Sequence, residues 1–263
     1  MIYRVDLHVY SNATEGAHSS IEELVRAARR AGLDAIAITD HDYCTPVPIE
    51  MRGVLLIPGC EITTLGGHIL GVFLERPIDF TRLHKHGLPT ADEAVLEIHR
   101  CGGLAILAHP FTDKNANPAL FPIRPDAVET ISARAALQRS DANEQALLWA
   151  TAHQRPQVGS SNAYSPAEVG NAYTEIACRR LSRSLLKEAL DLGHCRPVSV
   201  RDTNNTTCGY ANLTQAKRSG NLRSVLLSAA SLGICTVKDL IPKMHRPKKK
   251  KAYSKPKTKK SNK

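Results

Sequence analysis

The sequence predicts an α/β protein built as a distorted βα barrel of seven or eight strands. Two observations lead to this prediction. Over residues 1–200, short apolar runs alternate with amphipathic helical patterns, which is typical of βα units around a parallel sheet. Polar residues of metal-binding types follow several of the apolar runs, as catalytic residues do at the carboxyl ends of barrel strands. We therefore expect these side chains to meet at one end of a barrel.

The expected strands are short runs rich in aliphatic residues. They cover residues 3–8, 35–39, 53–58, 68–73, 104–108, 127–131, 157–159 and 174–177. The expected helices between them cover residues 20–32, 90–98, 143–153 and 184–192. Two of these helices begin with a capping box, in which Ser20 pairs with Glu23 and Thr90 pairs with Glu93. Each pair satisfies two backbone N–H groups that a helix start leaves without partners.

The C-terminal part of the chain has a different pattern. Residues 1–200 are assigned to the barrel, and residues 201–245 are expected to form a helical extension or lobe. Within that extension, Thr203–Thr207 resembles a loop and Asn221–Ser231 a short helix. Residues 246–263 are rich in Lys and Pro with almost nothing apolar, so we expect a disordered tail.

The positive charge of the chain is confined to this tail. The net charge is +10, and the tail holds ten Lys or Arg and no acid, so residues 1–245 sum to zero. A polyanion such as RNA or DNA is the expected partner, through sequence-independent charge contacts. The alternative is a solubilising or targeting extension. The densest part of the tail consists of Arg246, Lys248, Lys249, Lys250 and Lys251.

Two further features limit the location of the protein. No stretch approaches the roughly 18 apolar residues that a membrane span needs, and the N-terminus lacks a signal-peptide pattern. Seven cysteines are scattered without a CxxC pair, which is typical of small buried hydrophobic residues in a reducing compartment. We therefore expect a cytoplasmic protein without a membrane partner.

Imidazoles and carboxylates stand beside five of the expected strands. His8 ends the first strand, His41 follows the second, Glu61 the third, and His109 follows residues 104–108. His68 is the exception, because it begins its strand. Such nitrogen and oxygen ligands suit Zn, Mn or Fe. Two or three ions held close together stabilise both the attacking and the leaving oxygen of a phosphoryl displacement.

The order of several short motifs makes the likeness to one family specific. In sequence they are DLHVYS, ITDHD, GCE, GGHILG, LAHPF and GSSNAY, followed by VGNAYT. Over residues 1–200 the chain resembles the PHP (polymerase and histidinol phosphatase) family. The resemblance implies a TIM-like distorted barrel with up to three metal ions that hydrolyses phosphate esters. It also implies substrates such as histidinol phosphate, nucleotides or nucleic-acid ends.

The resemblance implies three groups of ligands. His8, Glu61 and positions 10 and 162 correspond to the first metal, and Glu61, His68 and His109 to the second. Glu15, His41 and position 164 correspond to the third. The family usually has His, Asp and His at the three remaining positions, where this chain has Tyr10, Asn162 and Tyr164. The second group is complete, so a divalent ion is expected there above all.

Three other residues are candidates for supporting roles. Asp40 stands beside a ligand histidine and is expected to orient its imidazole, with capping of a loop as the alternative. For Asp6 both roles remain open. Arg134 follows the strand that ends at Ile131 and is a candidate for binding a substrate phosphate, with a solvated arginine at a helix start as the alternative.

Two functions follow from these features. The first is a metal-dependent phosphoesterase that acts on nucleotides or nucleic-acid ends. The second is a degenerate PHP barrel that no longer catalyses and serves as an RNA-binding subunit, similar in architecture to the PHP-like subunit of ribonuclease P. The complete second group favours the enzyme, whereas the three replaced ligands and the basic tail favour the binding subunit.

Overall fold

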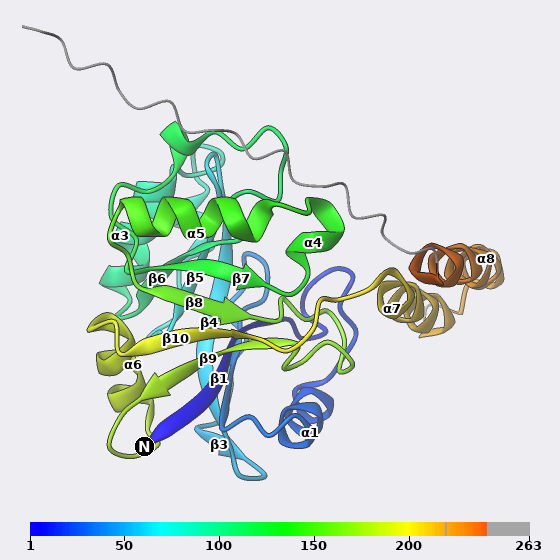
Figure 1. The fold of residues 1–263 in the computed structure, drawn as a ribbon, viewed down its shortest axis with the longest axis horizontal. Helices are drawn as coiled ribbons and strands as arrows, with labels where there is room; N and C mark the ends of the chain where they lie inside the picture. Colours follow the sequence, from blue (N-terminus) through cyan, green and yellow to red (C-terminus); the bar gives the residue numbers. More distant parts are fainter. Residues whose placement is uncertain (219, 241–263) are drawn as a thin grey trace, which may run out of the picture.

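The computed structural model describes residues 1–218 and 220–240. In this part of the chain a ten-stranded sheet curls into a nearly closed barrel, with most helices on its outside (Figure 1). The predicted fold class is therefore confirmed. The tail predicted to be disordered, residues 246–263, lies outside the described residues.

The sheet has the order β10-β9-β1-β2-β4-β5-β6-β7-β8, and β3 pairs with β4 off this path. The strands are β1 (Ile2–Val9), β2 (Ala35–Ile38), β3 (Glu50–Met51), β4 (Val54–Thr64), β5 (Gly67–Val72), β6 (Leu104–Ala108), β7 (Ala127–Ser132), β8 (Gln157–Ser160), β9 (Ala172–Ala177) and β10 (Cys195–Ser199). The helices are α1 (Ile21–Arg30), α2 (Phe80–Leu83), α3 (Ala91–Arg100), η1 (Pro118–Leu120), α4 (Ala135–Gln138), α5 (Ala142–Ala152), α6 (Arg183–Asp191), α7 (Asn205–Arg218) and α8 (Leu222–Leu240).

The sheet is mixed, whereas the alternating pattern predicted parallel strands. β1, β2 and β4 pair in parallel, as do β6, β7 and β8. β5 runs antiparallel to both of its neighbours, and β9 and β10 add an antiparallel ribbon beside β1. The connection from β4 to β5 is a tight turn without a helix, so β5 can only return antiparallel. The sequence pattern did not indicate β10.

The direction of β5 explains the position of His68. The first residues of β5 lie at the barrel end where the parallel strands finish, and His68 pairs with Ala108 at the end of β6. His109 is the next residue along the chain. A histidine at the start of an antiparallel strand thus lies at the same end of the barrel as the residues that follow the parallel strands.

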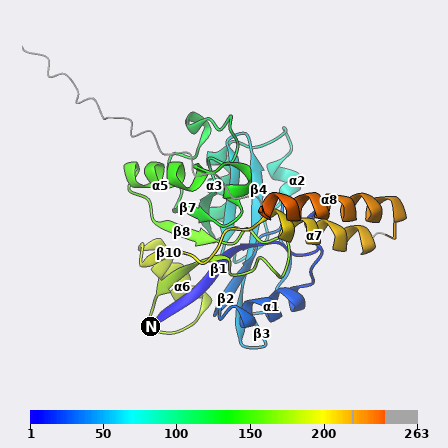
Figure 2. The same cartoon turned by 45° about the vertical axis from the view of Figure 1, so that its right-hand side comes forward.

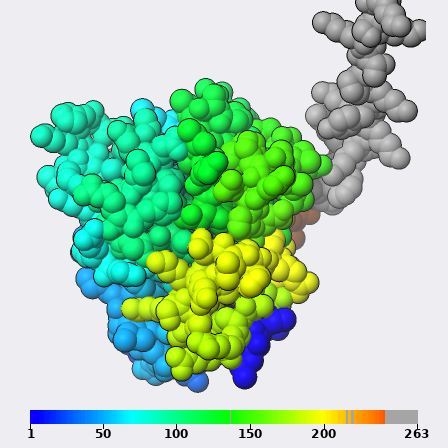
Figure 3. Space-filling model, turned by 90° about the vertical axis from the view of Figure 1, so that its left-hand side faces the viewer, coloured from blue at the N-terminus to red at the C-terminus, as the bar shows by residue number. Residues whose placement is uncertain are grey.

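The barrel closes where β8 meets β9 and β10. The hydroxyl of Thr174 in β9 donates to the carbonyl oxygen of Gly159 in β8 at 2.8 Å and accepts from its N–H at 3.0 Å. A Cβ at position 159 would lie 2.9 Å from the carbonyl oxygen of Tyr173, so glycine permits this close approach. Figure 3 shows the outer surface here, with the yellow residues around β10 packed below the green ones around α5.

Aliphatic side chains fill the layers inside and outside the sheet. One cluster joins β1, β2, β4 and β6 with α6, and a second packs α3 and α5 against β4, β5 and β6. A third joins α1 to β2 and β4. Both predicted capping boxes form, at Ser20 with Glu23 and at Thr90 with Glu93. No helix among the described residues is long and apolar enough to cross a membrane.

The C-terminal helices form a hairpin that projects from the barrel (Figure 2). The prediction of a loop over Thr203–Thr207 is wrong for its second half, because α7 begins at Asn205. The side chain of Asn204 accepts from the N–H of Thr207 at 2.7 Å and so caps the start of the helix. Asn is common both at helix starts and in loops, so the residue type alone does not distinguish the two. The second helix, α8, extends well beyond the predicted end at Ser231.

Candidate metal centre

Glu61 lies at the centre of a cluster of four imidazoles. Its side chain is fully buried in β4. His68 Nδ1 and His109 Nε2 lie 3.0 and 3.2 Å from Glu61 Oε1. His41 Nε2 and His8 Nε2 lie 3.1 and 3.5 Å from Glu61 Oε2. The cluster therefore contains both of the ligand types that bind Zn, Mn and Fe.

Glu61 reaches this position because β4 does not end at Pro58 as predicted. The first half of β4 pairs with β2, and from Gly59 onward the strand pairs with β5 instead. A Cβ at Gly59 would lie 2.6 Å from the carbonyl oxygen of Gly71, so only glycine fits where the strand changes partners. The carboxylate thus lies inside a strand, where the backbone fixes it more firmly than a loop would.

Tyr10 occupies the space between two of the predicted ligands. Its buried hydroxyl donates to Glu61 Oε2 at 2.5 Å and lies 2.7 Å from His8 Nε2. Burial and the neighbouring charge of Glu61 raise the pKa of the phenol well above 10. Tyr10 is therefore a neutral hydrogen-bonding residue at a position where the resemblance implies an imidazole.

Tyr164, another of the replaced positions, also faces the cluster. The hydroxyl of Tyr164 lies 3.2 Å from His41 Nε2, and its ring packs against Tyr10 with ring centres 4.3 Å apart. Burial is the main cause that raises the pKa of Tyr164. Asn162 has a positive φ of 52°, and its buried Oδ1 has no hydrogen-bond partner among the described residues.

Glu129 is a site residue that the sequence did not reveal. It is fully buried in β7, and its Oε1 lies 3.1 Å from His8 Nδ1. Its Oε2 accepts from the N–H of His109 at 2.7 Å, and its Oε1 accepts from the hydroxyl of Ser160. An acid in the middle of an otherwise apolar expected strand, residues 127–131, was the available signal.

The described residues contain two groups of three side chains whose ligand atoms lie within 4.8 Å of one another. One group is His41, Glu61 and His68, and the other is His8, His109 and Glu129. The resemblance had instead grouped Glu61 with His68 and His109, which also lie around Glu61 Oε1. The grouping found in the structure and the grouping implied by the resemblance therefore divide the same continuous cluster of side chains in two ways.

Charge balance in the cluster depends on His8. Burial alone would lower the pKa of His8, but Glu61 and Glu129 on either side raise it to about 10. Burial opposes the charge on Glu61 as well, yet His8 and the other imidazoles hold the pKa of that carboxyl well below its usual range. The imidazolium can then donate from Nδ1 to Glu129 and from Nε2 to Tyr10.

The donor set also fits a divalent cation. His68 Nδ1 is buried and, although it is 3.0 Å from Glu61 Oε1, it lacks the geometry of a hydrogen bond. Such an imidazole nitrogen, with a carboxylate and further imidazoles around it, is the donor arrangement of a catalytic metal site.

Two predicted residues lie elsewhere or have other contacts. Glu15 is exposed in the loop after β1 and belongs to neither ligand group. Asp40 does not orient the His41 imidazole as predicted, because its oxygens accept from Ser11 and Thr14 at 2.6–2.7 Å and from Thr45. The carboxylate thus holds the loop after β1, which was the alternative role.

Asp6 and Arg134 also connect parts of the framework. Asp6 accepts from the N–H and hydroxyl of Ser161 and from the N–H of Gly170, so it joins β1 to the segment after β8. Arg134 precedes α4 and donates to Glu168 Oε1 at 2.7 Å. Its guanidinium lies 4.4 Å from the centre of the Tyr164 ring. Arg134 is therefore already paired.

Comparison with known proteins identifies the family. The family model described as the PHP domain matches residues 6–101, and the one described as PHP-associated matches residues 140–195. An uncharacterized protein of Methanocaldococcus jannaschii is 32% identical in an alignment of 124 residues that covers 43% of this chain and 68% of the relative. The chain belongs to the PHP family of metal-dependent phosphoesterases.

Two further likenesses are consistent with this family. A probable phosphatase of Syntrophotalea carbinolica is 29% identical in an alignment of 147 residues that covers 47% of this chain and 59% of the relative. A two-domain protein of Bacteroides vulgatus, containing a predicted PHP-like metal-dependent phosphoesterase, has a similar structure with a TM-score of 0.55 at 21% identity. The similarity covers 76% of this chain and 65% of that one.

The fold also occurs in proteins of different description. PsfC of Pseudomonas syringae has a similar structure, with a TM-score of 0.54 at 15% identity. The similarity covers 89% of this chain and 98% of PsfC. Endonuclease Q, solved with a 27-mer duplex substrate, has a TM-score of 0.51 at 18% identity. The similarity covers 72% of this chain and 56% of the endonuclease. At these identities the likeness shows the fold alone.

Proposed function

We propose that this protein hydrolyses phosphate esters with the help of one or more divalent ions, Zn, Mn or Fe, held around Glu61. The observation that carries the proposal is the single buried carboxylate with four imidazole nitrogens within 3.5 Å. Glu61, His41, His68 and His109 would hold the ion. Bound there, it would supply a Lewis acid for the phosphoryl oxygen and a water of lowered pKa.

The remaining residues of the site would position and protect the reaction. Glu129 would fix the His8 ring and the His109 backbone, so that both imidazoles keep their orientation. A cavity of about 280 Å³ borders His68 and His109 and is lined by Thr112 and Asp113 among others. We propose that the substrate phosphate lies where this cavity meets the two imidazoles. Arg134 is not part of this proposal, because Glu168 already pairs with it.

The substrate class that we propose is a nucleotide or a nucleic-acid end. Its support is the family likeness together with the basic residues of the tail. Lys and Arg in that number would attract a polyanion through its phosphates, with an affinity that falls steeply as salt rises.

Hydrolysis of a panel of phosphate esters tests the proposed activity. The panel contains mononucleotides, oligonucleotides with a terminal phosphate and small alkyl phosphates, with Mn²⁺ or Zn²⁺ added. We expect turnover by the wild type, and a loss of at least about tenfold in kcat/KM for His109→Ala. His194→Ala is the matched control, because His194 is an exposed histidine outside both ligand groups. Absent turnover, or equal turnover in all three proteins, would contradict the proposal.

A second candidate is a non-catalytic barrel that binds RNA as a subunit of a larger assembly. One observation favours it: the Tyr10 hydroxyl already bonds Glu61 Oε2 and lies against His8 Nε2, two atoms that would otherwise bind metal. A protein purified without metal, whose RNA binding disappears when residues 246–263 are deleted, would favour this candidate over the enzyme.

A further inference from the structure

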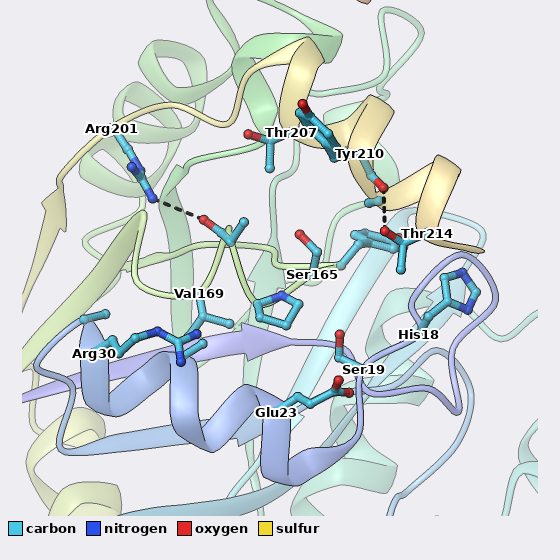
Figure 4. Close-up of a pocket in the computed structure, with 16 residues that line it drawn as sticks. His18, Ser19, Glu23, Arg30, Ser165, Val169, Arg201, Thr207, Tyr210 and Thr214 are labelled. Carbon is cyan, nitrogen blue, oxygen red and sulfur yellow. Dashed lines mark hydrogen bonds between the residues drawn. The ribbon is translucent and has the colours of Figure 1, made fainter. Parts of the chain in front are cut away.

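A large cavity lies between α1 and α7, beside the candidate metal centre. It encloses about 630 Å³, within the range of roughly 300–1,000 Å³ that is usual for small-molecule sites. Figure 4 shows α1 below the cavity and α7 above it, with Ser165 and Val169 between them. We call it the α1–α7 cavity.

The lining of this cavity is mostly apolar with a few polar groups. Tyr164 and Tyr210 contribute aromatic rings, and Ala27, Val169 and Ala211 contribute aliphatic surface. Rings of this kind pack well against a flat partner. Hydroxyl groups line the cavity at four further positions, Ser19, Ser165, Thr207 and Thr214. A planar ring system with a few polar edges is the ligand that such a lining suits.

Basic groups at the ends of the cavity suit the polar edges of a ligand. Arg30 and Arg201 lie at one end and His18 at the other (Figure 4). Nε2 of His18 is buried and has no hydrogen-bond partner among the described residues, so a polar atom of a ligand would satisfy it. Glu23, the acid in the lining, is engaged by the N–H and hydroxyl of Ser20.

Tyr164 connects the cavity to the metal centre. Its hydroxyl lies 3.2 Å from His41 Nε2, while the same residue lines the cavity. Arg134 holds the arrangement together, because its guanidinium lies over the Tyr164 ring and donates to Cys208 Sγ in α7 at 3.2 Å. Tyr164 thus contacts both the cavity and the metal centre.

The cavity depends on a part of the chain that the family models do not cover. α7, which supplies Thr207, Tyr210, Ala211 and Thr214 to the lining, lies outside both matched ranges. The part of the selectivity that α7 gives is thus a property of this chain's own C-terminal hairpin.

We infer that the α1–α7 cavity binds the organic part of the substrate, a planar and largely apolar ring system of about nucleoside size. The phosphate ester would then lie at the metal centre on the other side of Tyr164. This inference rests on the proposed phosphoesterase function. It adds that selectivity for the alcohol part comes from α1 and α7.

Substitutions on neighbouring residues of α7 test the inference in the full chain. Ala211→Phe places a ring in the cavity, whereas Asn212→Phe places the same ring on the adjacent exposed position. Tyr210→Ala removes an aromatic wall from a residue whose side chain is 59% exposed, so the fold should tolerate it. Each protein is assayed with adenosine 5′-monophosphate and with glycerol 1-phosphate, and kcat/KM is compared between the two esters.

We expect the ratio of kcat/KM for the nucleotide to that for glycerol phosphate to fall at least about tenfold in Ala211→Phe and Tyr210→Ala. The ratio should stay within about twofold of wild type in Asn212→Phe, since a surface substitution leaves the cavity open. An equal ratio in all four proteins would overturn the inference.

Binding of unphosphorylated adenosine, measured by calorimetry, separates this inference from the proposed function. If the wild type hydrolyses no ester, the proposed function fails. Adenosine binding that is present in wild type and Asn212→Phe but lost in Ala211→Phe would still support the cavity as a ring-binding site. Absence of adenosine binding in the wild type would overturn the inference even if small esters are hydrolysed.

Discussion

At the scale of single residues, the site is distinguished by Tyr10, which stands where the resemblance implies an imidazole. Tyr10 donates to Glu61 and accepts from His8, so a neutral phenol fills the place of an imidazole. The sequence predicted the replacement from the motif, but the phenol's partners depend on β1 and β4 lying two strands apart. Glu129 was missed because an isolated acid in an apolar run does not reveal which face of the strand it occupies.

Removal of the Tyr10 hydroxyl should have opposite effects on stability and metal binding. In Tyr10→Phe, Glu61 Oε2 loses a donor, so the metal-free protein should lose about 1–2 kcal/mol of unfolding free energy. Metal affinity should rise, because the phenol no longer competes for Glu61 and His8. Urea denaturation with a chelator and metal titration measure the two effects. Tyr3→Phe, near the N-terminus and outside the site, is the control; weaker metal binding by Tyr10→Phe would contradict the account.

Glu129→Gln should weaken metal binding without unfolding the protein. The amide keeps the size of the side chain but loses the charge that holds the His8 ring and raises the His8 pKa. We expect a loss of roughly 10–100-fold in metal affinity, as for other groups that orient metal-bound imidazoles. Competition titration against a coloured chelator measures it. Glu188→Gln, on the exposed side of α6, is the control, and an unchanged affinity in Glu129→Gln would remove Glu129 from the site.

At the scale of elements, local sequence patterns were enough to predict the helices, whose bounds depend on residues close together in the sequence. The capping boxes and the apolar periodicity placed α1, α3, α5 and α6 closely. Strand direction could not be predicted in the same way, because an apolar run has the same pattern in both directions. The direction depends on the strand with which it pairs. β5 and the β9–β10 ribbon are therefore the elements whose pairing only the structure reveals.

The start of α7 depends on a carboxylate from the far end of α8. Asp239 accepts from the N–H groups of Asn205 and Thr206, and these hydrogen bonds outweigh burial and lower its pKa from 3.8 to about 2. A lowered pKa contributes stability above pH 4 that is lost as the pH falls toward 2. Helical content measured by circular dichroism should fall over this window in the wild type.

The same substitution at two aspartates checks this assignment. Asp239→Asn should have lower helicity at pH 7 and a smaller change between pH 4 and pH 2 than the wild type. Asp191→Asn, at the end of α6, should follow the wild type, because Asp191 does not cap α7. Identical pH profiles for Asp239→Asn and the wild type would show that the carboxylate does not hold the hairpin.

At the scale of the whole molecule, a contact that joins distant strands lies close to the metal centre. Asp6 in β1 ties the segment after β8 through Ser161 and Gly170, next to the replaced ligand Asn162. Burial outweighs these hydrogen bonds and raises the pKa of Asp6 to about 6. The folded protein therefore holds the Asp6 proton more tightly than the unfolded chain does.

Asp6→Asn should change how stability depends on pH. With a folded pKa above the unfolded value of 3.8, the Asp6 contribution falls as the pH rises from about 4 to 6. The loss should be on the order of 2–3 kcal/mol and should be absent in Asp6→Asn. Chemical denaturation at several pH values in this range measures it. A wild-type profile that rises as steeply as that of the variant would contradict the account.

The central claim, that Glu61 and its imidazoles form a metal site, is tested most directly by counting metal ions. The full chain is purified from metal-supplemented cultures without chelator, and the metal per chain is measured by mass spectrometry. We predict at least about one Zn, Mn or Fe ion per wild-type chain, and the same in the control His194→Ala, whose imidazole lies outside the ligand groups. Glu61→Gln should have lost most of that metal. A metal-free wild type, or an equal count in Glu61→Gln, would contradict the claim.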